Sequence, residues 1–152
     1  MSAIIIIAIL VLATASSGAM FKPGEWYRGL RRPSWTPPNW AFPLVWSILY
    51  IAIGIAGWLV WQAGGLGVAM ILWLLQLILN AAWSWLFFGR KRMDLAFVDV
   101  GLLFVTIIAF MLAAYPVSQT AALLFLPYAA WVATAATLNR AVWRLNPDAA
   151  PA

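Results

Sequence analysis

FPLVWSILYIAIGIAGWLVWQ, residues 42–62, and VAMILWLLQLILNAAWSWLFF, residues 68–88, are two apolar stretches separated only by AGGLG, residues 63–67. A helix needs about 20 mostly apolar residues to span a bilayer, so each stretch is long enough to cross a membrane once. The connection is too short for anything but a tight turn, so the two helices must be antiparallel neighbours. The sequence therefore predicts a helical hairpin in lipid.

Three more apolar stretches extend this pattern, at residues 2–20, 95–115 and 120–143. The 152 residues are 66% hydrophobic and 9% charged with a mean hydropathy of +0.94, which lies outside the composition of soluble domains. Lipid offers peptide groups no hydrogen-bond partner, so all five spans should be α-helices. We expect an all-α integral membrane protein, a five-helix transmembrane bundle forming a single domain over 1–152.

The basic residues indicate how this bundle is oriented. They form three clusters, after the first span (Lys22, Arg28, Arg31, Arg32), after the third (Arg90, Lys91, Arg92) and at the end of the fifth (Arg140, Arg144). With five spans, all of them fall on one side of the membrane, the side that the positive-inside rule assigns to the cytoplasm. We expect a non-cytoplasmic N-terminus, a cytoplasmic C-terminus, a bacterial membrane and no nucleic-acid partner, despite a pI of about 10.3.

The first twenty residues also allow a different interpretation, as a cleaved signal peptide. Ala13-Thr14-Ala15 resembles an A-x-A cleavage site behind the apolar run IIIIAILVL. However, no positive charge precedes that run, and cleavage would place the basic clusters on the translocated side, against the charge bias. We therefore expect this segment to be retained as a helix.

Several kinds of chemistry find no residues in this sequence. Cysteine and histidine are absent, which removes thiol nucleophiles, imidazole bases and the commonest metal and haem-iron ligands. Of the four acidic residues only Asp99 lies inside a span, so paired-carboxylate hydrolysis and a metal site are not expected. For Asp99 itself we favour a structural role, within reach of Arg90, Arg92 or the membrane interface, over a functional one.

The connection at residues 21–41 is the only long loop, and its composition is typical of an ordered segment. It carries Trp26, Tyr27, Trp35 and Trp40, which are costly to expose, and prolines that restrict the backbone (Pro33, Pro37, Pro38 and, just after it, Pro43). We expect it to fold as a lid over one end of the bundle. The alternative is an aromatic belt at the headgroup level, and for Trp40, beside the end of a span, a place in that belt and a contact with ligand both stay open.

Three helices carry faces suited to a planar apolar ligand. Polar groups in a span usually point into the bundle, so Gln76 and Asn80 should face inward. The faces, taken at helical spacing, are Trp73, Gln76, Asn80, Trp83, Phe87; Trp46, Tyr50, Ile53, Gly57, Trp61; and Tyr128, Trp131, Ala135, Leu138, Asn139. Together they can wall a flat aromatic cavity with a few hydrogen-bonding groups. The alternative is ordinary packing, with the amides joining helices by hydrogen bonds.

Four segments in order resemble the translocator protein family (TspO, the peripheral-type benzodiazepine receptor). They are WYRGLRRPSWTPPNWAFPLVWSILY, QLILNAAWSWLFFG, AFVD and PYAAWVATAATLNRAVWRLN, between Trp26 and Asn146. The resemblance implies a five-helix bundle, often a homodimer, that binds porphyrins and other hydrophobic ligands beneath the first loop. It also implies that PSWTPPNW belongs to the lid.

The resemblance also suggests ligand-binding residues. Positions matching those near ligand in the family are Trp46, Tyr50, Asn80, Trp83, Trp131, Ala135 and Leu138. The lid and the inward faces add Tyr27, Trp35, Pro38, Gln76 and Phe87. In two places the chain departs from the family: Arg140 follows Asn139 where the cholesterol-recognition pattern has tyrosine, which leaves steroid binding open, and Leu95 replaces a tryptophan of animal relatives.

Three functions are compatible with the sequence. The first is a membrane receptor or sensor for a porphyrin-like tetrapyrrole, with no cofactor; lacking axial ligands, it should suit metal-free protoporphyrin IX better than haem. The second is an enzyme that degrades porphyrin oxidatively or under light through Trp46 and Trp131, as some family members are described to do. The third is a transporter of porphyrin or lipid, against which the spans show no inverted repeat and no intramembrane charge pair.

Overall fold

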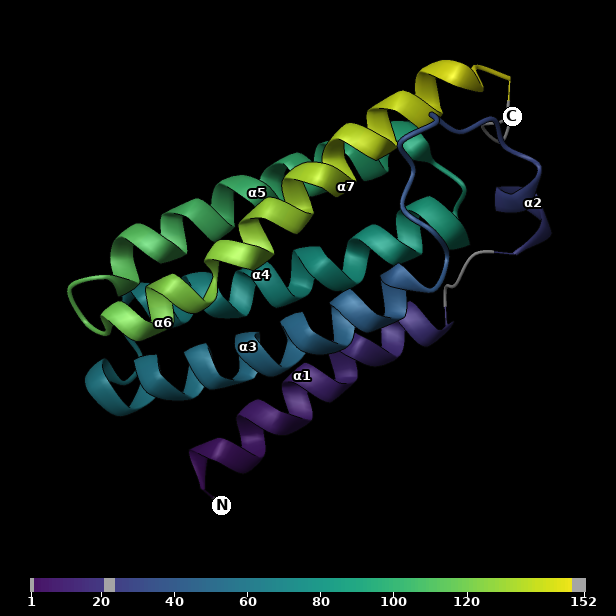
Figure 1. The fold of residues 1–152 in the computed structure, drawn as a ribbon. Helices are drawn as coiled ribbons and strands as arrows, with labels where there is room; N and C mark the ends of the chain where they lie inside the picture. Colours follow the sequence, from purple (N-terminus) through teal and green to yellow (C-terminus); the bar gives the residue numbers. More distant parts are fainter. Residues whose placement is uncertain (1, 21–23, 149–152) are drawn as a thin grey trace.

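The computed structural model describes residues 2–20 and 24–148 and contains five helical stretches long and apolar enough to cross a membrane (Figure 1). Lys22 and the first residues of the predicted lid, 21–23, lie outside the described residues. No strand occurs in the described part of the chain, so the predicted all-α membrane bundle is confirmed. The elements are α1 (Ala3–Met20), α2 (Glu25–Arg28), α3 (Ala41–Gly64), α4 (Val68–Ser84), η1 (Trp85–Gly89), α5 (Met93–Ala114), α6 (Gln119–Leu124) and α7 (Leu126–Leu145).

Helix α4 lies at the centre of the bundle. It packs against α1, α3 and α5, while α5 in turn packs against α7 and α6. Helix α3 meets α6, but its backbone makes few close approaches to α7, and aromatic side chains fill the space between these two helices. Helix α1 lies at one edge of the bundle beside α3 (Figure 1).

The α3–α4 hairpin turns at a glycine. Gly65 has φ +61°, a conformation that side chains with a Cβ rarely adopt, and its N–H donates to the carbonyl of Trp61 at 2.8 Å. That bond satisfies one of the free carbonyls at the end of α3. The short connection therefore makes the antiparallel pair expected from the sequence.

The fifth span departs from the single helix expected at 120–143. It consists of α6 and α7, separated at Phe125. The cause is Pro127, which has no N–H to donate to the carbonyl four residues earlier and whose ring crowds that carbonyl. Ser118 begins α6 by accepting a hydrogen bond from the N–H of Ala121 at 3.3 Å.

The end of the third span is not α-helical. Residues 85–89 form the π-helical turn η1, and beyond it the N–H of Arg90 donates to the carbonyl of Trp85 at 2.7 Å. A π turn accommodates one residue more than an α turn and changes the direction of the side chains that follow. Phe87 and Phe88 lie inside this turn, next to the lid.

Near the middle of the bundle, the predicted cavity wall at Gly57 is instead closed by packing. A Cβ at Gly57 would lie 2.4 Å from Cε2 of Trp73, whose indole is fully buried. The Trp73 Nε1–H donates to the carbonyl of Ile53 at 2.9 Å. The absence of a side chain at Gly57 therefore leaves the space into which the Trp73 ring packs.

The described part of the lid, 24–40, lies across the end of the bundle near the C-terminal end of α7 (Figure 1). Tyr27 and Leu30 are buried there against Phe87 and Met93. Trp35, by contrast, is 48% exposed. The sequence predicts an ordered segment over this end of the bundle, and the inner side of the segment belongs to the hydrophobic core.

Candidate ligand-binding site

A chain of hydrogen bonds runs through the bundle between α3, α4 and α7. The Tyr50 hydroxyl donates to Oδ1 of Asn80 at 2.9 Å, and Nδ2 of Asn80 donates to the Tyr128 hydroxyl at 2.7 Å. Tyr128 then donates to Oε1 of Gln76 at 2.8 Å. Gln76 and Asn80 are 0% and 4% exposed, which confirms that they face inward.

Aromatic rings enclose this chain on the side of α3. Trp46 stacks on Tyr50 with centroids 5.5 Å apart and meets Tyr128 edge-on at 6.3 Å. Buried amide groups are costly unless bonded, yet Nε2 of Gln76 has no hydrogen-bond partner among the described residues. The chain is thus bonded internally except at its Gln76 end.

Closer to the lid, the helices surround a partly enclosed cavity of about 20 Å³, called the lid cavity below. It lies where α2 covers the ends of α4 and α7. Its lining residues are mostly aromatic or aliphatic: Tyr27, Phe42, Trp83, Phe87, Phe88, Ala135, Leu138, Asn139 and Val142. This volume is less than one water molecule occupies in the liquid, about 30 Å³.

The aromatic side chains of the lid cavity contact one another edge-to-face or, for Phe87 and Trp83, with tilted rings. Tyr27 of the lid meets Phe88 at 5.5 Å between centroids and Phe87 at 6.1 Å. Phe87 also meets Trp83 at 5.5 Å. Such pairs contribute about 0.5–1.5 kcal/mol each beyond their buried area. The contacts of Tyr27 therefore help to hold the lid against the end of the bundle.

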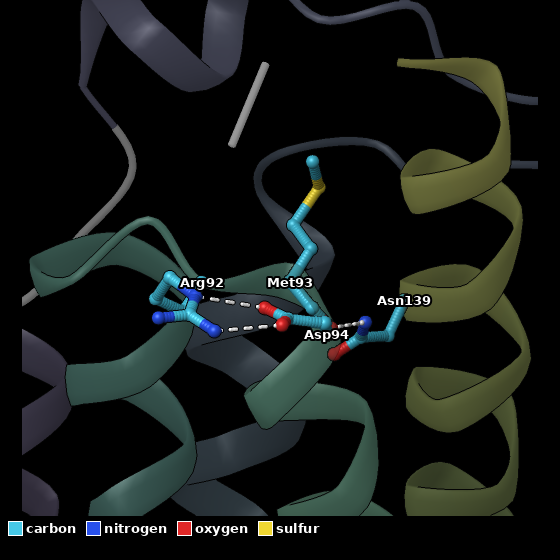
Figure 2. Close-up of polar contacts among 4 residues, drawn as sticks. All are labelled: Arg92, Met93, Asp94 and Asn139. Atoms are coloured by element: carbon cyan, nitrogen blue, oxygen red, sulfur yellow. Dashed lines mark hydrogen bonds and ion pairs between the residues drawn. The ribbon is translucent and has the colours of Figure 1, made fainter. Parts of the chain in front are cut away.

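Asn139 is the polar centre of the cavity wall. The Trp83 Nε1–H donates to Oδ1 of Asn139 at 3.0 Å, and Nδ2 of Asn139 donates to the carbonyl of Met93 at 3.0 Å. Figure 2 shows the second of these contacts, which joins α7 to the first residue of α5. One side chain therefore ties together α4, α5 and α7 at the level of the cavity.

Positive charge surrounds the lid. The guanidinium of Arg32 lies 5.0 Å from the ring centroid of Tyr27, and the Lys91 ammonium lies 6.0 Å from that of Trp26. Arg92 forms a two-pronged ion pair with Asp94, at 3.0 and 2.8 Å (Figure 2). The hydrogen bond to Asp94 holds the pKa of Arg92 above its ordinary value.

Among the described residues, Asp99 forms an ion pair with neither Arg90 nor Arg92, the two arginines that the sequence places within its reach. Arg92 bonds Asp94, only two residues away, whereas Asp99 is 7% exposed and its Oδ2 has no hydrogen-bond partner within the described residues. Asp94 lies in the first turn of α5, next to the basic connection, and is therefore the carboxylate that pairs with the guanidinium of Arg92. No cluster of metal-binding side chains was found in 2–20 and 24–148.

The twelve residues predicted to bind ligand fall into four groups. Five line the lid cavity: Tyr27, Trp83, Phe87, Ala135 and Leu138. Four belong to the hydrogen-bonded chain or stack on it: Trp46, Tyr50, Gln76 and Asn80. Trp131 lies between these groups, edge-on to Phe42 at 5.5 Å, while Trp35 and Pro38 are on the exposed side of the lid.

Four cavity residues were not among the twelve. Asn139 lay on the predicted inward face of the fifth span, but Phe42, Phe88 and Val142 had no signal beyond their apolar character. Phe88 reaches the cavity because the π turn η1 directs its side chain there.

A second, open hollow of about 480 Å³ lies on the lid itself. It is lined by Leu30, Arg32, Pro33, Thr36, Pro37, Pro38 and Asn39.

Comparison with known proteins gives a consistent set of relatives. Protein CrtK of Rhodobacter capsulatus is 37% identical over 143 residues, 90% of this chain and 88% of the relative. The tryptophan-rich sensory protein of Cereibacter sphaeroides is 40% identical over 134 residues (88% and 85%), and the human translocator protein is 44% identical over 137 (85% and 81%). The sequence pattern of the TspO/MBR family matches residues 3–144, nearly the whole described bundle. This multi-pass membrane protein therefore belongs to the TspO/MBR family.

Proposed function

We propose that this protein is a membrane receptor or sensor that binds a porphyrin-like tetrapyrrole, or a ligand of similar shape, between the lid and the ends of α4 and α7. The observation that carries the proposal is the lid cavity, with its aromatic walls and one polar pair, Trp83 and Asn139. Flat aromatic ligands are recognised by such walls together with a few placed hydrogen-bonding groups. The name of one relative, a sensory protein, agrees with a receptor role.

Charge supports the same class of ligand. A free-base porphyrin such as protoporphyrin IX has an apolar ring and carboxylate arms, and Arg32 of the lid and Lys91 beside the lid lie against the lid rings Tyr27 and Trp26. The ring suits the aromatic interior, and the carboxylates suit the basic rim. With no histidine or cysteine to bind iron, the chain favours the metal-free ring.

Binding requires the cavity to widen, because pockets for drug-sized ligands have volumes of roughly 300–1,000 Å³ and the lid cavity has about 20 Å³. The lid carries Tyr27, the cavity wall that is not part of a spanning helix. Movement of the lid is therefore the direct way to make room. A change in the lid on binding is also what a sensor needs to pass on a signal.

A pair of alanine variants tests the site. Ala135 lines the cavity, while Ala133, two residues earlier on α7, is exposed on the outside of the bundle. Ala135→Leu should fill the cavity and weaken protoporphyrin IX binding at least roughly tenfold, whereas Ala133→Leu should bind like the unmodified protein. Binding is measured by tryptophan quenching in detergent, in darkness.

The same titration separates the three functions. Saturable binding with an unchanged porphyrin spectrum agrees with a receptor. A new absorbing product under light, lost in Trp46→Phe or Trp131→Phe, would replace the proposal with the enzyme. Movement of porphyrin between vesicle compartments would favour a transporter, and equal binding by both alanine variants would place the ligand elsewhere.

We also propose that the lid end faces the cytoplasm and that the protein forms a homodimer. The described arginines and Lys91 all lie in the lid, in the connection after η1 or near the end of α7, whereas the turns at 65–67 and 115–118 have no charged residue. The chain has no cysteine, so single-cysteine variants report topology cleanly. Ser34→Cys should be protected from an impermeant maleimide in intact cells, and Leu66→Cys should be labelled. The reverse result would overturn the orientation.

The proposed homodimer is tested by chemical crosslinking in native membrane, which should give a dimer band.

A further inference from the structure

Asn146, just after α7, holds the lid by its backbone. Its Oδ1 accepts a hydrogen bond from the N–H of Arg31 at 2.9 Å, and its Nδ2 donates to the carbonyl of Arg31 at 2.8 Å. The amide thereby pairs with both backbone groups of one lid residue. This contact joins positions 115 residues apart in the sequence.

The Asn146 side chain is itself anchored. Its Nδ2 also donates to the carbonyl of Val142 at 2.8 Å, one turn back along α7. The amide nitrogen thus uses both of its hydrogens, one on its own helix and one on the lid. An anchored side chain loses little freedom when it binds, so the contact with the lid is preorganised.

Releasing Arg31 would free the part of the lid that seals the cavity. Tyr27 and Leu30 precede Arg31 within little more than one turn of chain, and both are buried against the end of the bundle. Tyr27 is also a wall of the lid cavity. The backbone contact at Arg31 therefore restrains the segment that must move for the cavity to open.

We propose that Asn146 is the latch of the lid, a positioning residue whose contact with the Arg31 backbone sets how often the lid cavity opens. Only the statement that an open cavity admits a ligand rests on the proposed function. The latch itself is a property of the protein alone. It predicts that Asn146 matters through the backbone of Arg31, and that the Arg31 side chain does not.

Two variants separate these contributions. Asn146→Ala removes the latch, while Arg31→Ala removes only a side chain and keeps both backbone atoms that Asn146 binds. Hydrogen exchange of the amide at residue 31, resolved by overlapping peptides, should be roughly tenfold faster in Asn146→Ala. It should stay near the unmodified rate in Arg31→Ala. Circular dichroism and gel filtration establish that each variant is folded.

Opening of the cavity is measured without any ligand. Val142 lines the cavity and is fully buried, so a thiol introduced by Val142→Cys reacts with a water-soluble methanethiosulfonate only when the lid moves. Adding Asn146→Ala to this background should raise the labelling rate by the same factor as the exchange rate. Adding Arg31→Ala should leave it unchanged.

The proposal is overturned if exchange at residue 31 and labelling at residue 142 are the same with and without Asn146. It is also overturned if Arg31→Ala accelerates both as much as Asn146→Ala does. Protoporphyrin IX, added last, should associate faster with Asn146→Ala. If no variant binds porphyrin, the proposed function fails, but exchange and labelling still decide the latch.

Discussion

Gly57→Ala is the substitution whose effect is most directly set by the geometry of the bundle. The new Cβ would lie 2.4, 2.6 and 2.7 Å from Cε2, Cζ2 and Nε1 of Trp73. These atoms belong to a fully buried ring between α3 and α4, not to the end of a flexible side chain. The indole must therefore shift, and with it the hydrogen bond to the Ile53 carbonyl.

The cost follows from two terms. Forcing an extra methyl into a packed core costs roughly 1–3 kcal/mol, and leaving a buried N–H and carbonyl unpaired costs about 1–3 kcal/mol. Replacing glycine inside a helix returns about 1 kcal/mol. We therefore expect Gly57→Ala to lower the free energy of unfolding by about 1–5 kcal/mol.

Gly54→Ala is the matched control, one turn earlier on α3. Its Cβ would meet only Cγ2 of Val11, at 3.8 Å, an ordinary contact. Unfolding by SDS in mixed micelles, followed by tryptophan fluorescence, should show Gly57→Ala destabilised and Gly54→Ala unchanged or slightly more stable. Trp73→Phe added to Gly57→Ala should recover part of the loss, because the smaller ring leaves space. Equal stability of the two alanine variants would refute the packing argument.

Three more substitutions test the polar contacts by the same unfolding assay. Asn80→Ala removes the acceptor of Tyr50 and a donor to Tyr128, so we expect a loss of roughly 1–2 kcal/mol; no loss would mean that the two hydroxyls find other partners. Tyr128→Phe removes one hydroxyl of the same chain, and combined with Asn80→Ala it should cost less than the sum of the two; additivity would contradict a connected chain. Asp94→Asn breaks a pair with Arg92 in which each side chain is 37% exposed, so the loss should stay below about 1 kcal/mol, and a larger one would show that the pair holds the start of α5.

The parts of the fold that the sequence predicts are those that lipid imposes. The five spans and the inward position of Gln76 and Asn80 follow from the cost of exposing polar groups to lipid. The tight turn at Gly65 follows from the short length of the connection between α3 and α4. The break at Phe125 could also have been predicted, because Pro127 disfavours a continuous helix there. The long apolar run around Pro127 made a single span the simpler interpretation. These features depend on local sequence alone.

The parts that the sequence does not predict depend on what packs against what. Asp99 and Asp94 are both acids near the start of α5, and only the position of Arg92 relative to the first turn decides which is paired. The π turn η1 leaves no mark in an apolar sequence, yet it brings Phe88 to the cavity. Nor does an aromatic face reveal whether a ring lines a cavity or fills it, as Trp73 does at Gly57.

Trp73 and the tyrosine–asparagine chain together restrict where the bundle can open. Below the lid, Tyr50, Asn80 and Tyr128 bond one another, and opening that region would break buried hydrogen bonds. At the lid end, by contrast, the cavity is closed by aromatic contacts and by the hydrogen bonds of the latch to α7. Water can replace these hydrogen bonds when the lid moves out. The lower cost of opening is therefore at the lid.

The same comparison ranks the predicted ligand-binding residues. A ligand that reaches Asn80 meets an amide whose oxygen and nitrogen are already bonded to tyrosines. By contrast, Nε1 of Trp131 is buried with no hydrogen-bond partner in the described part of the chain, and Trp131 packs on Phe42, a wall of the cavity. A bond from a ligand to this N–H replaces no existing one, so it gains the full benefit of satisfying a buried donor. Trp131→Phe should therefore weaken a ligand with an acceptor near Phe42 more than Asn80→Ala does.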